Sequence, residues 1–227
     1  MEKVHDIPYM IRRICETAYE EADRAGTKDL RIMAVTKNVS VQIIELARAQ
    51  GITLYGENRV QEFLTKQTYF EQHKLDVHLI GHLQSNKVKQ AVRVFDTIQS
   101  VDSVRIASLI GKEALVKSIT QKILLEVNIG KEPNKYGFLY EETEEAVEII
   151  KDIPGVQIIG LMTIPPIGDE RVARDCFSSM HRLFIDIISK KKDNIRMEIL
   201  SMGMSADYVE AIREGSNMIR IGSAFFR

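Results

Sequence analysis

A lysine, Lys37, follows a short apolar run from Leu30 to Val35 near the start of the chain. If that run is a buried strand, packing holds the stem of the lysine, and desolvation favours the neutral amine that carbonyl chemistry requires as a nucleophile. The alternative is a lysine that covers apolar surface with its stem while its ammonium reaches solvent without a chemical role. Lys37 is therefore a candidate to form a Schiff base with a ligand that carries an aldehyde or ketone.

Two turns of small residues near the end of the chain could hold an anion. They are SMGMS, from Ser201 to Ser205, and IGS, from Ile221 to Ser223. Glycines let backbone N–H groups approach an anion closely, and serine hydroxyls add further donors. The same pattern would also occur if Gly203 and Gly222 only made tight turns. Together with Lys37, the two turns favour a phosphorylated carbonyl compound as the ligand.

Arg220 lies two positions before Gly222, so the two residues point to the same face if this segment is a strand. An arginine is rarely buried without a partner. Near a ligand it could meet a carboxylate, a phosphate or a ring nitrogen. A structural salt bridge with Glu126 or Glu198 would explain the same residue, and the residues alone leave both interpretations open.

A repeating pattern of short apolar runs and helical stretches must position these residues. Runs rich in β-branched residues and without clean alternation are typical of parallel strands that are buried on both faces. Strands that alternate with helices eight times indicate an α/β fold, a single (β/α)8 TIM barrel, whose functional groups gather at the carboxyl ends of the strands. A doubly wound open sheet is the main alternative. The expected strands cover residues 30–35, 52–56, 77–81, 95–100, 122–128, 156–162, 196–201 and 218–223.

An extra amphipathic helix is expected before the first strand, from about Ile7 to Ala25, whereas only the letters AFFR follow the last strand. Because the first and last strands of a closed barrel are neighbours, this N-terminal helix could cover the gap left by a short eighth helix. We therefore expect one domain over residues 1–227, with no residues after Arg227 for a second one.

Composition argues against several classes of function. The net charge of −1 provides no basic field for nucleic acid, and no apolar run reaches the length of a membrane span. Cys15 and Cys176 stand far apart, as expected for reduced thiols in the cytoplasm. No cluster of histidine, cysteine and aspartate has the spacing of a metal site. We expect a cytoplasmic protein with no metal and with neither a nucleic-acid nor a membrane partner.

Longer motifs in the chain resemble those of the pyridoxal phosphate homeostasis protein family, which is related to the N-terminal barrel of alanine racemase. The resemblance runs from about Leu30 to the C-terminus, and the motifs occur in order at the ends of the expected strands. They are AVTK, YGENRVQE, HLIGHLQSNK, SVDS, EVNI, KYGF, GLMTI, LSMGMSADYVEAIREGS and RIGSAFF.

The resemblance implies pyridoxal phosphate as the cofactor and an alanine-racemase-like barrel as the fold that binds it. It also implies a role for each residue that matches a motif of the family. The matching residues are Lys37 for the aldimine, Ser201, Gly222 and Ser223 for the phosphate, Arg220 for the pyridine nitrogen, Asn58 and Met162 for the ring, and Lys135 for a secondary cofactor site.

The same resemblance implies a non-catalytic carrier, a monomer that maintains vitamin B6 homeostasis, gives pyridoxal phosphate to apo-enzymes and acts indirectly on amino-acid pools. An arginine does not release a proton to the ring nitrogen, so Arg220 would weaken the electron sink that catalysis needs. A racemase tolerates a weaker sink, but it requires a second domain with an opposing base, for which we expect no residues here. Two alternatives remain: an amino-acid racemase that uses this cofactor, and a cofactor-free lyase in which Lys37 attacks a sugar phosphate.

Overall fold

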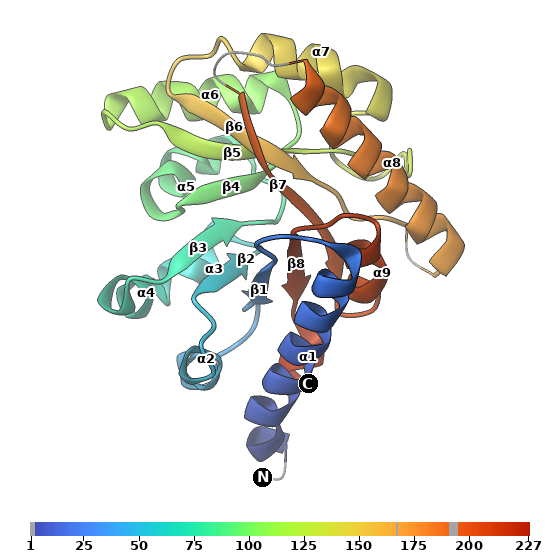
Figure 1. Ribbon diagram of the computed structural model, residues 1–227. Coiled ribbons are helices and arrows are strands. Elements are labelled where there is room, and N and C mark those ends of the chain that lie inside the picture. Colours follow the sequence, from blue (N-terminus) through green and yellow to red (C-terminus); the bar gives the residue numbers. More distant parts are fainter. Residues whose placement is uncertain (1–2, 167, 191–194) are drawn as a thin grey trace.

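Eight parallel strands close into a barrel in the computed structural model, which describes residues 3–166, 168–190 and 195–227 (Figure 1). Consecutive strands are neighbours, and the first pairs with the last, so that Met33 lies in register with Arg220. This closed order confirms the predicted TIM barrel and excludes the doubly wound open sheet. The strands are β1 (Arg31–Val35), β2 (Leu54–Glu57), β3 (Asp76–Leu79), β4 (Thr97–Val101), β5 (Gln121–Glu126), β6 (Val156–Met162), β7 (Ile195–Met204) and β8 (Met218–Ile221).

Helices follow the strands and cover the outside of the barrel (Figure 1). The connection after β2 holds two short helices, and a single helical turn follows β8. The helices, with one 3-10 turn labelled η1, are α1 (Lys3–Ala25), α2 (Val41–Ala49), α3 (Val60–Leu64), α4 (Gln67–His73), η1 (Ser85–Lys87), α5 (Val88–Val94), α6 (Val104–Val116), α7 (Tyr140–Ile150), α8 (Glu170–Ser189), α9 (Tyr208–Arg213) and α10 (Ser223–Phe226).

The N-terminal helix α1 covers the barrel beside its last strand. It packs against α2, α9 and α10, and Figure 1 shows it running next to α9 and the C-terminus. Ile11 and Ala18 of α1 are fully buried, and Arg213 of α9 donates to Glu21 at 2.8 Å. Because α10 has only one turn, α1 provides the cover that a full eighth helix would give, as predicted.

Apolar side chains form a large core between strands and helices and a smaller core inside the barrel. Successive side chains of a strand point to opposite faces, so in β1 Ile32 and Ala34 join the outer core whereas Met33 joins the inner one. Since Arg220 is the register partner of Met33, it points into the barrel as well. The inner core consists of Met33, Leu54, Leu124, Ile159, Met162, Ile199 and Met218.

Two strand ends near the predicted site differ from the expected ones. β7 continues to Met204 instead of ending at Ser201, so that Ser205 is the residue that follows the strand. β8 ends at Ile221 instead of at Ser223, so that Gly222 and Ser223 lie beyond it. β1 ends at Val35 as expected, and Lys37 lies beyond it in a turn. Both differences change which side chains reach the mouth of the barrel.

Candidate functional site

A cavity of about 600 Å³ lies at the carboxyl ends of β1, β7 and β8. Its wall brings together four of the predicted site residues, namely Lys37, Arg220, Gly222 and Ser223. Ser205 lines the same cavity. The volume lies within the range of about 300–1,000 Å³ that is usual for pockets that bind small molecules.

The candidate nucleophile, Lys37, lies in a tight turn at the rim of this cavity. The Val39 N–H donates to the Thr36 carbonyl at 3.0 Å, and Asn38 has the left-handed backbone (φ 57°) that asparagine tolerates well. Lys37 is exposed, so packing does not hold its stem in the way that a position at a strand end would. The turn, and not the strand, therefore directs Lys37 toward the cavity.

Two backbone N–H groups after β8 converge on one oxygen in the cavity wall. The N–H groups of Gly222 and Ala224 both donate to the Ser205 hydroxyl oxygen, each at 3.2 Å. Convergent backbone donors of this kind are suited to an oxyanion such as a phosphate. Ser205 belongs to the SMGMS turn predicted to hold an anion, but the resemblance implied Ser201, and not Ser205, for the phosphate.

Arg220 is almost completely buried where the barrel interior meets the cavity. Its guanidinium donates through Nη1 to Ser201 Oγ at 2.7 Å and through Nη2 to the Thr163 carbonyl at 2.8 Å. Burial lowers the pKa of Arg220 to about 10, although Asp207 and Glu126 oppose this, so the side chain stays charged at neutral pH. Among the described residues no carboxylate forms an ion pair with Arg220, and the alternative of a structural salt bridge is not supported.

Ser201, which was expected to hold a phosphate, lies inside the barrel instead of in the cavity wall. It is fully buried, and its hydroxyl donates to Gln99 Oε1 at 2.7 Å while it accepts from Arg220. The Gln99 Nε2 atom in turn lies 2.8 Å from His78 Nδ1. These contacts make Ser201 part of a polar chain that orients Arg220, and the geometry gives no support to a direct phosphate contact.

A carboxylate at the end of β5 has a property that residue spacing does not reveal. Burial and the charge of Asp102 raise the pKa of Glu126 to about 7, whereas Arg220 and Lys135 lower it. Glu126 therefore titrates near neutral pH in the mouth of the barrel. From the sequence Glu126 was predicted only as a possible partner for Arg220, because burial, the main cause of the pKa shift, arises only when the barrel closes.

The two residues predicted to line a ring, Asn58 and Met162, do not belong to the cavity wall. Asn58 follows β2, and its carbonyl lies so close to Gly81 that a Cβ there would approach it to 2.3 Å. Met162 ends β6, is fully buried and belongs to the inner core. Their contact with a bound ring stays a prediction.

Lys135 borders a second cavity, of about 770 Å³, near the ends of β3 and β4. Its ammonium donates to the Pro165 carbonyl at 3.2 Å and pairs with Glu132. In the wall of this cavity His82 stacks on Tyr136, with the ring centroids 3.5 Å apart. A secondary cofactor site at Lys135 stays a prediction.

Within the described ranges, no three or more histidine, cysteine, aspartate or glutamate side chains are grouped so that they could hold a metal ion. None of the described helices is both long enough and apolar enough to cross a membrane. Cys15 and Cys176 are free thiols.

The chain is similar in sequence to proteins of one group. Residues 16–227 match the family described as alanine racemase, N-terminal domain. The pyridoxal phosphate homeostasis protein of Aquifex aeolicus is 36% identical over 219 residues, which cover 95% of this chain and 95% of that protein.

Solved structures of similar sequence also match this chain over most of its length. An unknown protein from Bifidobacterium adolescentis has a TM-score of 0.92 at 32% identity, over 99% of this chain and 96% of that one. PipY from Synechococcus elongatus, with PLP bound, has a TM-score of 0.80 at 32% identity, over 91% of this chain and 100% of that one.

Proposed function

This chain belongs to the pyridoxal phosphate homeostasis protein family and carries the alanine racemase N-terminal domain, and on that premise we propose that it binds pyridoxal phosphate in the cavity between β1, β7 and β8. The observation that carries the proposal is the meeting of three kinds of group at one cavity. They are a lysine amine, a set of anion donors and a buried arginine.

The anion donors fit the phosphate of the cofactor. The Gly222 and Ala224 N–H groups already share one oxygen acceptor, the Ser205 hydroxyl, and Ser223 lies between them in the chain. A phosphate oxygen can accept from the same N–H groups while the Ser205 hydroxyl rotates to donate to the phosphate. Hydrogen bonds to a charged acceptor contribute about 1.5–3 kcal/mol each, so this turn can supply much of the affinity.

Lys37 fits the aldehyde of the cofactor, because it borders the same cavity as the phosphate donors. Pyridoxal phosphate would supply an aldehyde carbon and an electron-withdrawing ring. We propose that Lys37 holds the cofactor as an aldimine. Exposure of Lys37 suits a lysine that must take up and release a ligand from solution.

Arg220 favours a carrier over a catalyst. Its guanidinium is held by Ser201 and Thr163 and keeps its charge at neutral pH, so it does not hand a proton to a ring nitrogen placed beside it. Pyridoxal phosphate held there would keep an unprotonated ring nitrogen and would be a weak electron sink. We therefore propose that the protein stores cytoplasmic pyridoxal phosphate and passes it to apo-enzymes, with an indirect effect on amino-acid pools.

Borohydride trapping tests the assignment of Lys37. Purified protein loaded with pyridoxal phosphate is reduced and digested, and the peptides are mapped by mass spectrometry. We expect a phosphopyridoxyl group on Lys37, and loss of the visible absorption band in Lys37→Ala. Label on Lys135 alone would contradict the assignment. Absence of any cofactor band in the wild-type protein would instead favour the cofactor-free lyase.

A further inference from the structure

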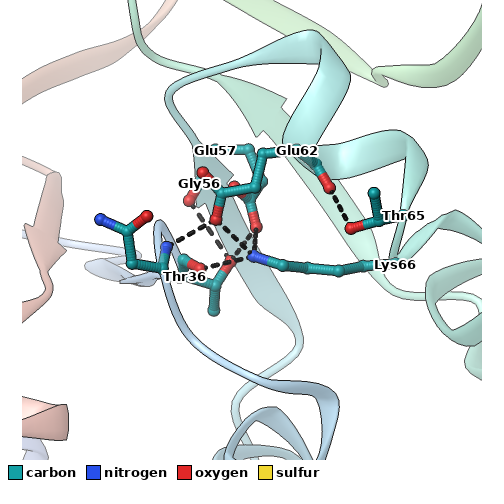
Figure 2. A network of polar contacts seen from close by, with 7 residues as sticks. Thr36, Gly56, Glu57, Glu62, Thr65 and Lys66 are labelled. Atoms are coloured by element: carbon teal, nitrogen blue, oxygen red, sulfur yellow. Dashed lines mark hydrogen bonds and ion pairs between the residues drawn. The ribbon is translucent and has the colours of Figure 1, made fainter.

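Charged side chains are buried beneath the turn that carries Lys37. The Lys66 ammonium, between α3 and α4, donates to Glu57 at 3.0 Å and to Glu62 at 2.8 Å, as Figure 2 shows. Glu57, at the end of β2, is fully buried, and the Lys66 side chain is 8% exposed. The Thr36 hydroxyl also donates to Glu57, at 2.7 Å.

This network bonds to the backbone on both sides of Lys37. Lys66 Nζ donates to the Thr36 carbonyl, which belongs to the peptide group before Lys37, at 2.8 Å (Figure 2). Glu62 Oε1 accepts from the Asn38 N–H, which belongs to the peptide group after Lys37, at 2.5 Å. The two peptide planes that determine where the Lys37 Cα–Cβ bond points are therefore both held by one ion pair.

Stability alone does not account for such an arrangement. Two carboxylates and one ammonium leave a net negative charge, and burial raises the pKa of Glu57, although Thr36 and Lys66 oppose this. Replacing buried ion pairs by apolar residues is often neutral or stabilising. A use that apolar residues cannot supply is to hold backbone carbonyl and N–H groups in one geometry.

We propose that Lys66 and Glu62 are positioning residues that aim Lys37 at the aldehyde of the bound cofactor; this inference rests on the proposed function. In the capture step the Lys37 amine adds to the aldehyde carbon, a C=N bond replaces the C=O bond, and water leaves with the aldehyde oxygen and both amine protons. The amine must reach that carbon while the phosphate is anchored at the β8 turn. Misplacement of reacting groups by about 1 Å can lower the rate of their reaction about a hundredfold.

Two ligands separate positioning of Lys37 from general damage to the site. Pyridoxine 5′-phosphate has the same ring and phosphate but an alcohol in place of the aldehyde, so it binds without bonding to Lys37. For Lys66→Met we expect the rate at which pyridoxal phosphate bonds to Lys37 to fall about ten- to a hundredfold. We also expect the Kd of pyridoxal phosphate to rise. The Kd of pyridoxine 5′-phosphate should change less than about twofold, since its anchors are intact.

Gln121→Met is the matched control, because Gln121 is also buried and donates to the carbonyls of Phe95 and Asp96, at the opposite end of the barrel. It should leave the ratio of the two Kd values as in the wild type. An unchanged ratio in Lys66→Met, or an equal loss of both ligands, would overturn the positioning role.

A second pair of variants keeps the test valid if Lys66→Met does not fold. Glu62, at 21% side-chain exposure, tolerates change better than the buried lysine. Glu62→Ala removes the acceptor for the Asn38 N–H and should reproduce the selective loss, whereas Glu62→Gln keeps an oxygen there and should restore most of the affinity. Equal behaviour of these two variants would contradict the proposal.

Lys37→Ala separates failure of this inference from failure of the proposed function. If Lys37→Ala keeps the imine absorption band, the assignment of Lys37 is wrong and the positioning role is lost with it. If Lys37→Ala loses the band while Lys66→Met and Glu62→Ala bind pyridoxal phosphate normally, only the positioning role is wrong.

Discussion

Ser201 Oγ and Arg220 Nη1 are joined by a hydrogen bond of 2.7 Å inside the barrel. Because the Ser201 hydroxyl also donates to Gln99, its proton and a lone pair are both used within the protein. The guanidinium of Arg220 is thereby fixed between Ser201 and the Thr163 carbonyl. Ser201 thus orients an arginine, whereas Ser205 lines the cavity, and the contact of either serine with a phosphate stays a prediction.

The two serines should therefore respond differently to the same substitution. Ser205→Ala removes the hydroxyl proposed to donate to the phosphate, so we expect the affinity for pyridoxal phosphate to fall about ten- to a hundredfold. Ser201→Ala leaves a buried Arg220 N–H and the Gln99 Oε1 without this partner, so it should reduce the free energy of unfolding by about 1–3 kcal/mol. Titration with cofactor and urea denaturation of both variants measure the two effects.

A direct phosphate role for Ser201 would produce the reverse pattern. In that case Ser201→Ala would lose affinity at least tenfold, about 1.4 kcal/mol, while Ser205→Ala would bind almost normally.

Arg220→Lys tests the value of the guanidinium fork. A lysine keeps the positive charge but cannot present two parallel donors to Ser201 and Thr163. We expect a loss of about 1–3 kcal/mol in the free energy of unfolding, because one buried acceptor is left without its donor. Urea denaturation at neutral pH measures it. A loss below about 0.5 kcal/mol, the usual effect of a surface substitution, would show that the two contacts are dispensable.

Glu126 should make stability depend on pH. Its pKa is raised from 4.5 to about 7 in the folded protein, chiefly by burial, so between these values the folded state holds a proton that the unfolded state has released. Stability is therefore greatest below about pH 4.5 for this group and declines as the pH rises through about 7. The decline amounts to at most about 3.5 kcal/mol.

Glu126→Gln removes this titration and serves as the comparison. The difference in free energy of unfolding between variant and wild type should grow from pH 5 to pH 8, in favour of the variant. Urea midpoints at intervals of one pH unit suffice to measure it. A difference that stays constant over this range would mean that Glu126 has the pKa of an ordinary carboxyl group.

Amino-acid turnover should be negligible in the loaded protein. If Arg220 faces the ring nitrogen as proposed, the ring is a poor electron sink, and racemisation and transamination lack the stabilisation that pyridoxal phosphate enzymes use. Incubation with a panel of amino acids, followed by chiral chromatography, should show no product above the background. A parallel assay should show recovery of activity by an apo-enzyme that receives the cofactor. Steady turnover at about 1 s⁻¹ or more, the lower end of typical enzyme rates, would contradict the carrier role.

The order of short apolar runs and helical stretches was enough to predict the barrel and the cover provided by α1. A local pattern is sufficient because neighbouring residues in the chain determine whether a segment is apolar on both faces, as in a buried strand, or has helical periodicity. It also placed Lys37, Arg220, Gly222 and Ser223 at one mouth, since strand ends converge in any closed parallel barrel.

The tertiary structure alone decided which side chains meet. Whether Ser201 or Ser205 faces the cavity depends on where β7 ends, and a shift of a few residues along a strand changes the face and depth of a side chain. The pKa of Glu126 and the ion pair of Lys66 beneath Lys37 arise from burial and from contacts between residues far apart in the chain. The spacing of residues along the sequence does not predict such contacts, because they form only when the barrel closes.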